Sequence, residues 1–223
     1  MRNRKSTEII AALSASAALG VIVLSSCESV PRIDRKLHSA IGKALAREAL
    51  SLSGQGGQIT VIARDTEAFR QPAMDVLLES FRREIRRAGV AIAATHLIEL
   101  DPLRPVEVPP GDFFELIRRS PRERVIVSFL GPPLLLEEQR IQLGRVQPKI
   151  VAFCSGSLVE NMDLRRFFDA GLLHAAVVRR RDAGVAADKP TKGAFEQLYQ
   201  TVRSADLAAS PAPSGAARPP GNQ

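Results

Sequence analysis

The residues best placed to bind a ligand follow the predicted strands of this chain. The stretch CSGS, residues 154–157, ends one strand, and Ser157 with Glu160 forms a capping box for the next helix. Free N–H groups at such a helix start attract anions, and arginines follow neighbouring strands. These loops predict a candidate site for a small carboxylate or phosphate, made of Arg64, Asp65, Ser155, Gly156, Ser157, Arg179 and Arg180. The alternative is that Ser157 caps a helix and has no further role.

No pattern of residues predicts a reaction. Cys154 ends an apolar strand and is expected to be a small buried side chain instead of a nucleophile. The three histidines, His38, His96 and His174, share no metal-ligand spacing. Ser155 has no glycine two residues before it, so it does not match a nucleophile elbow. We therefore predict a protein that is not an enzyme and that uses no metal or cofactor.

The N-terminus has the composition of an export signal. Arg2, Arg4 and Lys5 precede an apolar run at residues 9–24, which is shorter than the roughly 20 residues of a membrane-spanning helix. The run ends in LSSC, residues 24–27, which resembles the lipobox of bacterial lipoproteins. The resemblance implies cleavage after residue 26 and lipidation of Cys27. A retained anchor with an incidental cysteine is the alternative.

Lipidation of Cys27 would place the rest of the chain in the cell envelope. The resemblance implies acyl chains that hold the protein on the membrane, with the body facing the periplasm. Glu28 follows the modified position, where an aspartate would retain a lipoprotein in the inner membrane, so the outer membrane is favoured. Cys154 is then the one thiol left, and no internal disulfide is expected.

Composition is consistent with one folded domain after the signal. Hydrophobic residues make up 45% of the 223 residues, enough for an ordinary core. Removing residues 1–26, which hold three basic residues and one acidic residue, lowers the formal charge from +7 to +5. This mild charge is interleaved with acidic residues, and nucleic acid is not an expected partner.

We divide the chain into four regions. Residues 1–26 are the signal, and residues 27–57 are a lipid-anchored tether with a helix at 34–53 that packs on or lies beside the domain. Residues 58–203 form an α/β domain. Residues 204–223 are rich in Ala, Pro, Gly and Ser, and we predict a disordered tail there.

Five apolar stretches separated by helical patterns predict the architecture. Because parallel strands need crossover helices and bury both faces, we expect a single flavodoxin-like, three-layer α/β domain with a five-stranded, mainly parallel sheet in the order 2-1-3-4-5. Asp112 and Glu115 form a plausible capping box. The expected strands cover residues 58–63, 90–98, 124–130, 149–154 and 172–178, and the expected helices begin at Pro72 and cover 112–120, 132–144, 158–171 and 191–202.

Residues 59–90, ITVIARDTEAFRQPAMDVLLESFRREIRRAGV, resemble the opening of periplasmic substrate-binding proteins of the sugar-receptor and ABC-transporter type. The resemblance covers a strand, a loop, a long helix and the start of a second strand. Those receptors close two lobes around a ligand, and this chain has sequence for one.

Two functions follow as expectations. One is a non-enzymatic envelope lipoprotein that docks onto a protein partner, and the other is a one-lobed receptor for a small anionic or carboxylate ligand. A pocket joining Arg64, Ser155, Ser157 and Arg179 would favour the receptor. Filled strand ends, with an exposed apolar patch near Phe113 or Phe167, would favour docking. The single tyrosine and the absence of tryptophan leave few aromatic platforms for a sugar ring.

Overall fold

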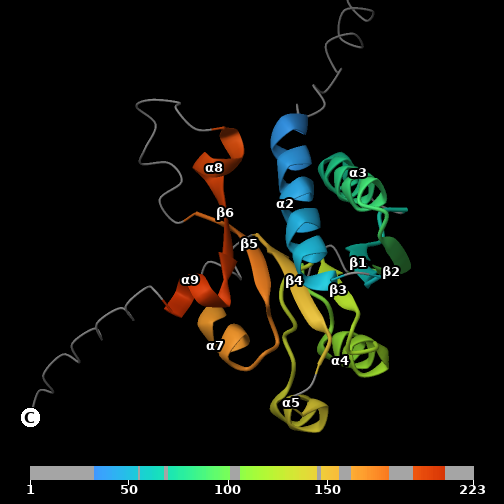
Figure 1. Ribbon diagram of the computed structural model, residues 1–223, viewed down its shortest axis with the longest axis vertical. Coiled ribbons are helices and arrows are strands. Elements are labelled where there is room, and N and C mark those ends of the chain that lie inside the picture. Colours follow the sequence, from blue (N-terminus) through green and yellow to red (C-terminus); the bar gives the residue numbers. More distant parts are fainter. Residues whose placement is uncertain are drawn as a thin grey trace, which may run out of the picture. The chain divides into compact units, whose positions relative to one another are not determined.

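A twisted sheet of six strands forms the middle of the described structure (Figure 1). The structure is a computed structural model, and it describes residues 33–54, 56–67, 70–100, 106–144, 147–155, 162–180 and 193–208. All that follows concerns the unit that begins at Asp34. The strands are β1 (Gln58–Arg64), β2 (Ala91–Ile98), β3 (Val125–Ser128), β4 (Lys149–Cys154), β5 (Ala175–Arg179) and β6 (Tyr199–Arg203).

The first five strands run parallel in the order 2-1-3-4-5, as predicted. The central strands are continuous apolar stretches because helices cover both of their faces. β2 lies at one edge and has alternating burial along its whole length. The prediction of a flavodoxin-like α/β domain is confirmed, with one strand more than the five expected.

The sixth strand corrects the prediction of a single helix over residues 191–202. The helix α8 is short, Ala194–Leu198, and the chain then continues as β6, which pairs antiparallel with β5. The segment YQTVR contains two β-branched residues and an aromatic residue, which favour a strand. The tail predicted to be disordered from Ser204 begins with the short helix α9 (Ser204–Ala208), and residues 209–223 lie outside the described residues.

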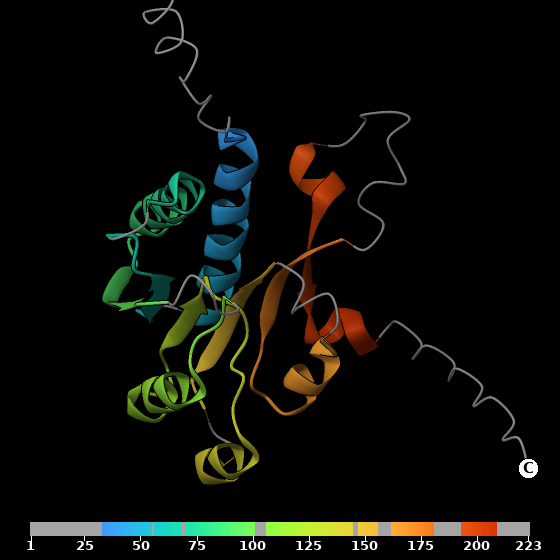
Figure 2. The same ribbon diagram turned by 180° about the vertical axis from the view of Figure 1, so that it is seen from behind.

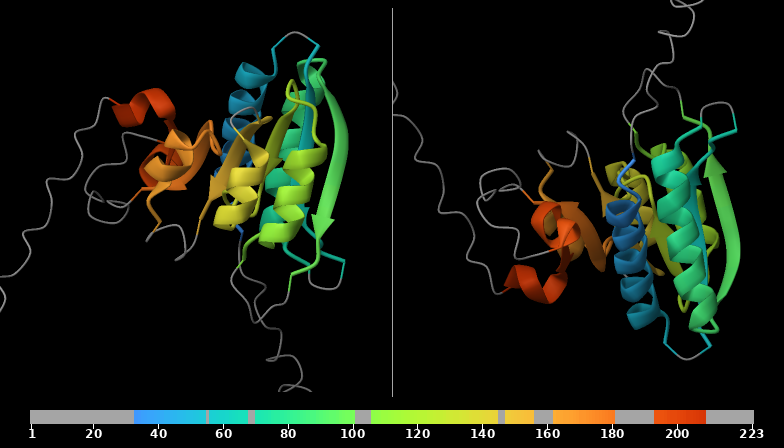
Figure 3. Two further views of the ribbon diagram at one scale, coloured as in Figure 1. Left: turned by 90° about the horizontal axis from the view of Figure 1, so that it is seen from below. Right: turned by 90° about the horizontal axis from the view of Figure 1, so that it is seen from above.

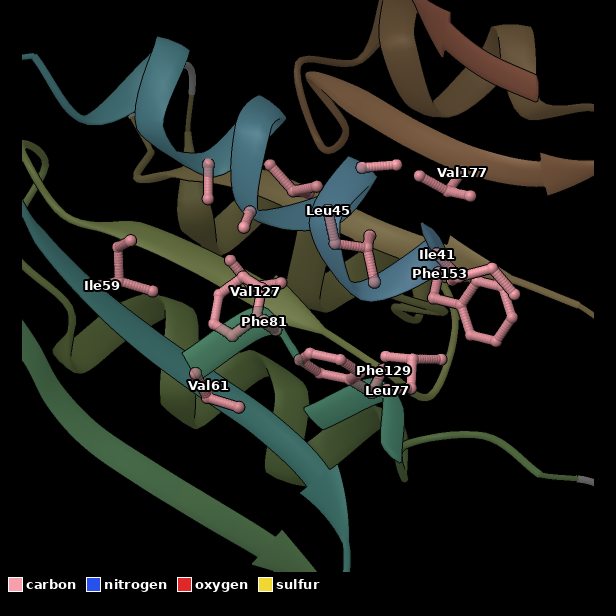
Figure 4. Packing of buried hydrophobic residues seen from close by; sticks show 14 of the residues in the cluster. Ile41, Leu45, Ile59, Val61, Leu77, Phe81, Val127, Phe129, Phe153 and Val177 are labelled. Atoms are coloured by element: carbon pink, nitrogen blue, oxygen red, sulfur yellow. The ribbon is translucent and has the colours of Figure 1, made fainter. Parts of the chain in front are cut away.

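One face of the sheet is covered by α2 (Arg35–Ser53) and α3 (Pro72–Arg87), which lie side by side (Figures 2 and 3). The two helices approach closely at Gly42, where a Cβ atom would lie 2.3 Å from the carbonyl oxygen of Leu77. Ile41, Leu45 and Phe81 are fully buried against β1 and β3 in the larger core cluster (Figure 4). α2 is therefore a core element of the domain.

α4 (Pro110–Arg119), α5 (Glu137–Leu143) and α7 (Leu164–Asp169) belong to the other face. Phe113 and Ile117 of α4 and Phe168 of α7 pack in a second core cluster with β3, β4 and β5. α4 begins at Pro110 with no side-chain cap, so the predicted Asp112–Glu115 capping box is wrong. Glu115 instead pairs with Arg118 and Arg119 on the helix surface.

The C-terminal strand is tied to α2 by an ion pair. Glu48 is buried at 3% exposure, and its two carboxylate oxygens accept hydrogen bonds of 2.6 and 2.7 Å from the guanidinium of Arg203 on β6. These hydrogen bonds raise the pKa of Arg203. Among the helices in the described part of the chain, none combines the length and apolar character that crossing a bilayer requires.

Candidate functional site

The candidate site lies at the edge of the sheet where β1, β3, β4 and β5 end. Because these strands are parallel, their carboxyl ends lie along one edge, where ligands bind in open α/β sheets. Arg64, Asp65, Ser155, Arg179 and Arg180 are at this edge, as predicted from the sequence. Gly156 and Ser157 lie outside the described residues, and so does Arg181.

Arg64 and Arg179 are not neighbours. Arg64 ends β1 and Arg179 ends β5, with β3 and β4 between them. Three strand spacings separate the two backbones by about 14 Å. The predicted site is therefore spread along the sheet edge, with two strands between its arginines.

Asp65 has a structural role. Its N–H donates to the carbonyl of Ile98 at 2.9 Å and continues the pairing of β1 with β2. Its Oδ1 accepts from the N–H of Glu67 at 2.9 Å, which closes a turn after β1. These two bonds account for an aspartate at this position without a ligand.

Arg179 and Arg180 are held by the sixth strand. Arg179 is exposed and lies opposite Tyr199, the first residue of β6, while the N–H of Arg180 donates to the carbonyl of Leu198 at 2.9 Å. Residues 199–202 were predicted as the end of a helix, so the pairing of β6 along β5 was not predicted. The backbone of Arg179 and Arg180 therefore takes part in the contact with the α8–β6 segment.

A small cavity lies beside the ends of β3 and β4, with a volume of about 30 Å³. That volume holds one or two water molecules, whereas pockets for small molecules start at roughly 300 Å³. One residue that lines this cavity, Ser155, was predicted as a site residue from the sequence, whereas Glu107 and Phe129 were not. The lining includes Glu107, Phe129, Leu130, Gly131, Phe153 and Ser155.

Apolar side chains fill the end of β3. Phe129 and Leu130 are 2% and 3% exposed, and Pro132 and Pro133 behind them are also buried. Phe129 packs edge-on against Phe81 of α3, with ring centroids 5.3 Å apart, and its N–H donates to Ile62 at 2.9 Å. Both Phe129 and Leu130 belong to the apolar run that predicted a strand over residues 124–130, whereas β3 ends at Ser128.

Cys154 at the end of β4 is unsuited to covalent chemistry. The thiol is buried, and burial raises its pKa to about 12, so it is protonated at neutral pH. This confirms the expectation of a small buried side chain. Among the described residues, no group of three His, Cys, Asp or Glu side chains is arranged to hold a metal ion.

A second hollow lies on the surface between α2 and α3. Arg35, Lys36 and Lys43 of α2 and Arg83 of α3 line it, and Glu79 lies 3.7 Å from Arg83. It is a wide groove of about 470 Å³, bordered by long charged side chains that water can reach. Its residues were not predicted as a site from the sequence.

The predicted docking patch near Phe113 and Phe167 is not present. Phe113 is fully buried, and Phe167 packs against the second core cluster beside the buried Phe168. α4 and α7 turn Phe113 and Phe168 toward the sheet, whereas Phe114 is half-buried and belongs to neither core cluster. The exposed large apolar side chains of the described residues are Leu97, Val106, Leu136 and Ile141.

Two of these exposed side chains belong to the connection that forms α5. Leu136 at the start of the helix is 58% exposed and Ile141 within it is 72% exposed. No residue of α5 is buried. The helix thus presents apolar side chains to solvent.

Comparisons with known proteins identify the fold. A scan against protein-family models and a comparison with curated proteins find no match. A carbohydrate-transporter solute-binding protein from Agrobacterium radiobacter, solved in complex with D-arabinose, is similar at 12% identity and a TM-score of 0.50, covering 79% of this chain and 61% of its own. An arabinose-binding protein from Geobacillus stearothermophilus is similar at 12% identity and a TM-score of 0.50, covering 77% and 62%.

A sugar-transport periplasmic component from Hahella chejuensis is similar at 15% identity and a TM-score of 0.44, with 50% of its length covered. The chain thus spans between half and three fifths of these proteins. The similarity is one of fold, that of a periplasmic sugar-binding lobe, and it agrees with the resemblance seen at residues 59–90.

Proposed function

We propose that this protein is a non-enzymatic lipoprotein of the cell envelope whose α/β domain docks onto a protein partner. The observation that carries the proposal is the filled end of the sheet, where Phe129 and Leu130 occupy the place in which an open α/β sheet receives its ligand. At this end of the sheet, the described residues leave a cavity of about 30 Å³, which is too small for a sugar or an amino acid.

Opening this end would expose apolar surface that is now buried. The side chain of Phe129 lies in the same cluster as Phe81, Val127 and Phe153. Fully burying a side chain of this size stabilises a protein by about 1.5–3 kcal/mol relative to exposure, so a ligand would have to offset that cost before binding. This argues against a receptor that opens here.

We place the docking surface on α5. Its exposed Leu136 and Ile141 contribute nothing to the core, and a partner that covers them would bury their apolar surface in the interface. Glu137, Glu138 and Arg140 surround them, which gives the polar rim of a typical interface. Neither side chain is needed to hold α5 in place, because Leu135 and Leu143 pack against the second core cluster.

Docking is tested by photo-crosslinking in the native envelope. A benzoylphenylalanine at position 141 should yield one crosslinked product that is absent when the same probe stands at the exposed position 122, on the loop after α4. The variant Leu136→Ser should reduce the yield at position 141 at least about threefold, since a buried interface side chain often contributes more than 1 kcal/mol. Equal labelling at both positions would contradict docking through α5.

Membrane attachment is proposed through Cys27, which lies outside the described residues. The support is the LSSC motif after the apolar run at residues 9–24. Cys27→Ser should abolish incorporation of labelled palmitate and shift the protein out of the detergent-extracted membrane fraction. Unchanged palmitate labelling in that variant would contradict lipidation there. We propose the outer membrane, because Glu28 takes the place of the aspartate that retains such proteins.

The second candidate function is a one-lobed receptor for a small anionic or carboxylate ligand. It is favoured by the fold, since the similar Agrobacterium protein was solved with D-arabinose, and by the hydroxyl of Ser155 in the wall of the cavity. A receptor of this kind would melt at a higher temperature with its ligand present. The double variant Arg179→Ala, Arg180→Ala should then abolish the rise.

A further inference from the structure

The two edges of the sheet differ in how they end. β2 pairs with β1 on one side, and among the described residues no backbone group pairs with its other side. In a strand paired on one side, every second residue directs its N–H and C=O outward. Figure 3 shows β2 as the outermost strand, along the edge that α3 leaves open. Such a row of unpaired groups is a template for another strand.

β2 lacks the charged side chains and prolines that often protect an edge. It contains no Lys, Arg, Asp, Glu or Pro between Ala91 and Ile98. Its exposed side chains are Ala91, Ala93, Thr95 and Leu97, and Leu97 is 56% exposed. A register shift near Ala93 interrupts the start of the strand, which leaves Ala94–Ile98 regular. The regular part is centred on His96, the residue after Thr95.

The charges at the two ends of β2 are opposite. Arg86, at the end of α3, is exposed and precedes the strand, and Glu99, also exposed, follows it. Neither has an ion-pair partner in the described part of the chain. In an antiparallel neighbour with the same sequence, the end that carries Glu99 would lie beside the Arg86 end of β2. The Arg86 end of the neighbour would then lie beside the Glu99 end of β2.

We propose that β2 is a dimerisation edge that pairs antiparallel with β2 of a second copy of this chain. The two-fold axis would be perpendicular to the sheet at Thr95, so that Thr95 lies opposite Thr95 of the partner subunit and the two six-stranded sheets join. Within the regular part of the strand, this register sets the exposed Thr95 opposite the same exposed residue of the second copy, and it sets the half-buried Ala94 opposite the half-buried His96.

The other edge strand serves as the matched control. β6 carries Arg203, which is bound to Glu48, and α8 and α9 flank it at its two ends. Charged residues and flanking helices are the ordinary protection of an edge. Thr201 in β6 has the same side chain as Thr95, so Thr201→Lys tests the same change on the protected edge.

The experiment measures the mass of the full-length chain by analytical ultracentrifugation in a mild detergent. The wild-type protein should sediment with twice the mass of one chain. The mass of one chain of 223 residues, before any cleavage, is 24.2 kDa. Thr95→Lys should raise the dimer dissociation constant at least tenfold because two lysines would face each other at the axis. Thr95→Glu should do the same, and an equimolar mixture of the two variants should recover the dimer.

Thr201→Lys should leave the dimer intact, and circular dichroism at 222 nm should show that all variants fold. A monomeric wild type at 100 µM chain would overturn the proposal, and so would a Thr95→Lys protein that remains dimeric. Failure of the lysine and glutamate variants to recover a dimer when mixed would overturn the register. None of these outcomes depends on lipidation or on a partner at α5.

Discussion

The connection between β3 and β4 holds apolar residues in two opposite environments. Its first part, after Ser128, buries Phe129 and Leu130 at the carboxyl end of the sheet, and its second part exposes Leu136 and Ile141 on α5. The first part fills the place where this fold binds ligands, and the second leaves apolar side chains in water. One short stretch therefore closes the usual site and offers a different surface.

This contrast is the basis for proposing a docking surface on α5 instead of a ligand site at the strand ends. Burial of Phe129 and Leu130 accounts for those residues through stability alone, whereas stability does not account for Ile141 at 72% exposure. A fold shared with sugar-binding proteins does not fix the site, because function depends on the particular side chains placed on the fold.

The largest expected effect comes from Phe129→Ala. Removing a ring that is 2% exposed and packed on Phe81 should lower the free energy of unfolding by about 3–5 kcal/mol. Urea unfolding followed by circular dichroism measures the loss. Phe114→Ala, at a half-buried position of α4, is the control and should cost less. A cost below about 1 kcal/mol for Phe129→Ala would show that the strand end is not a packed core.

A smaller effect is expected for Cys154→Ser at the end of β4. The substitution places a hydroxyl in a buried apolar site and should cost about 1–3 kcal/mol. The native thiol should also resist alkylation, since a pKa raised from 9.0 to about 12 lowers the thiolate fraction about a thousandfold. Labelling is measured in a Cys27→Ser background. Rapid labelling of folded protein would mean that this strand end is open.

The pH dependence of stability tests the packing at the opposite end of the strands, where His174 directly precedes β5. His174 accepts a hydrogen bond from the N–H of Ile150 at 3.2 Å, and burial, with Lys149 nearby, lowers its pKa. The unfolded chain therefore binds a proton more readily than the folded one. Stability from this group is complete above about pH 6.5 and decreases as the pH falls toward its lower folded pKa.

Chemical unfolding at pH 7 and at pH 5.5 measures this decrease. His174→Gln should flatten it, because glutamine keeps an acceptor and does not titrate in this range. An unchanged slope in the variant would assign the pH dependence to other groups.

The smallest effect on stability is expected for Ile141→Ser. An exposed substitution on α5 should change the free energy of unfolding by less than about 0.5 kcal/mol. The same variant should lose the crosslinked partner captured through a probe at position 136. A loss of more than 1 kcal/mol would mean that Ile141 belongs to the core, and the contrast with Phe129 would fail.

Much of the fold follows from the sequence because burial in a parallel sheet leaves continuous apolar stretches. Apolar runs alone predicted the strands at residues 59–63, 125–128 and 149–154, without tertiary information. The rule that crossover connections are right-handed then predicted the strand order. β6 was missed because YQTVR follows a short helix and pairs with a strand about twenty residues away, which a local pattern does not show. The capping box at Asp112 was wrong because Pro110 begins the helix earlier.

The candidate site was only partly predictable. Strand ends can be read from the sequence, so Arg64, Asp65, Ser155, Arg179 and Arg180 were placed on the correct edge. The distance between Arg64 and Arg179 depends on strand order. The burial of Phe129 at the end of β3 depends on how α3 packs over that strand. Neither property is local, so the sequence left a pocket and a filled strand end as alternatives, and the described residues show a filled end.

The most direct test of the docking proposal is a thermal-shift measurement of the full-length protein against D-arabinose and other pentoses, small carboxylates and inorganic phosphate. A filled strand end predicts no change in melting temperature at millimolar ligand, because nothing binds the folded state preferentially. A rise that grows with ligand concentration and disappears in the Arg179→Ala, Arg180→Ala double variant would contradict docking as the function of this domain and would establish a receptor.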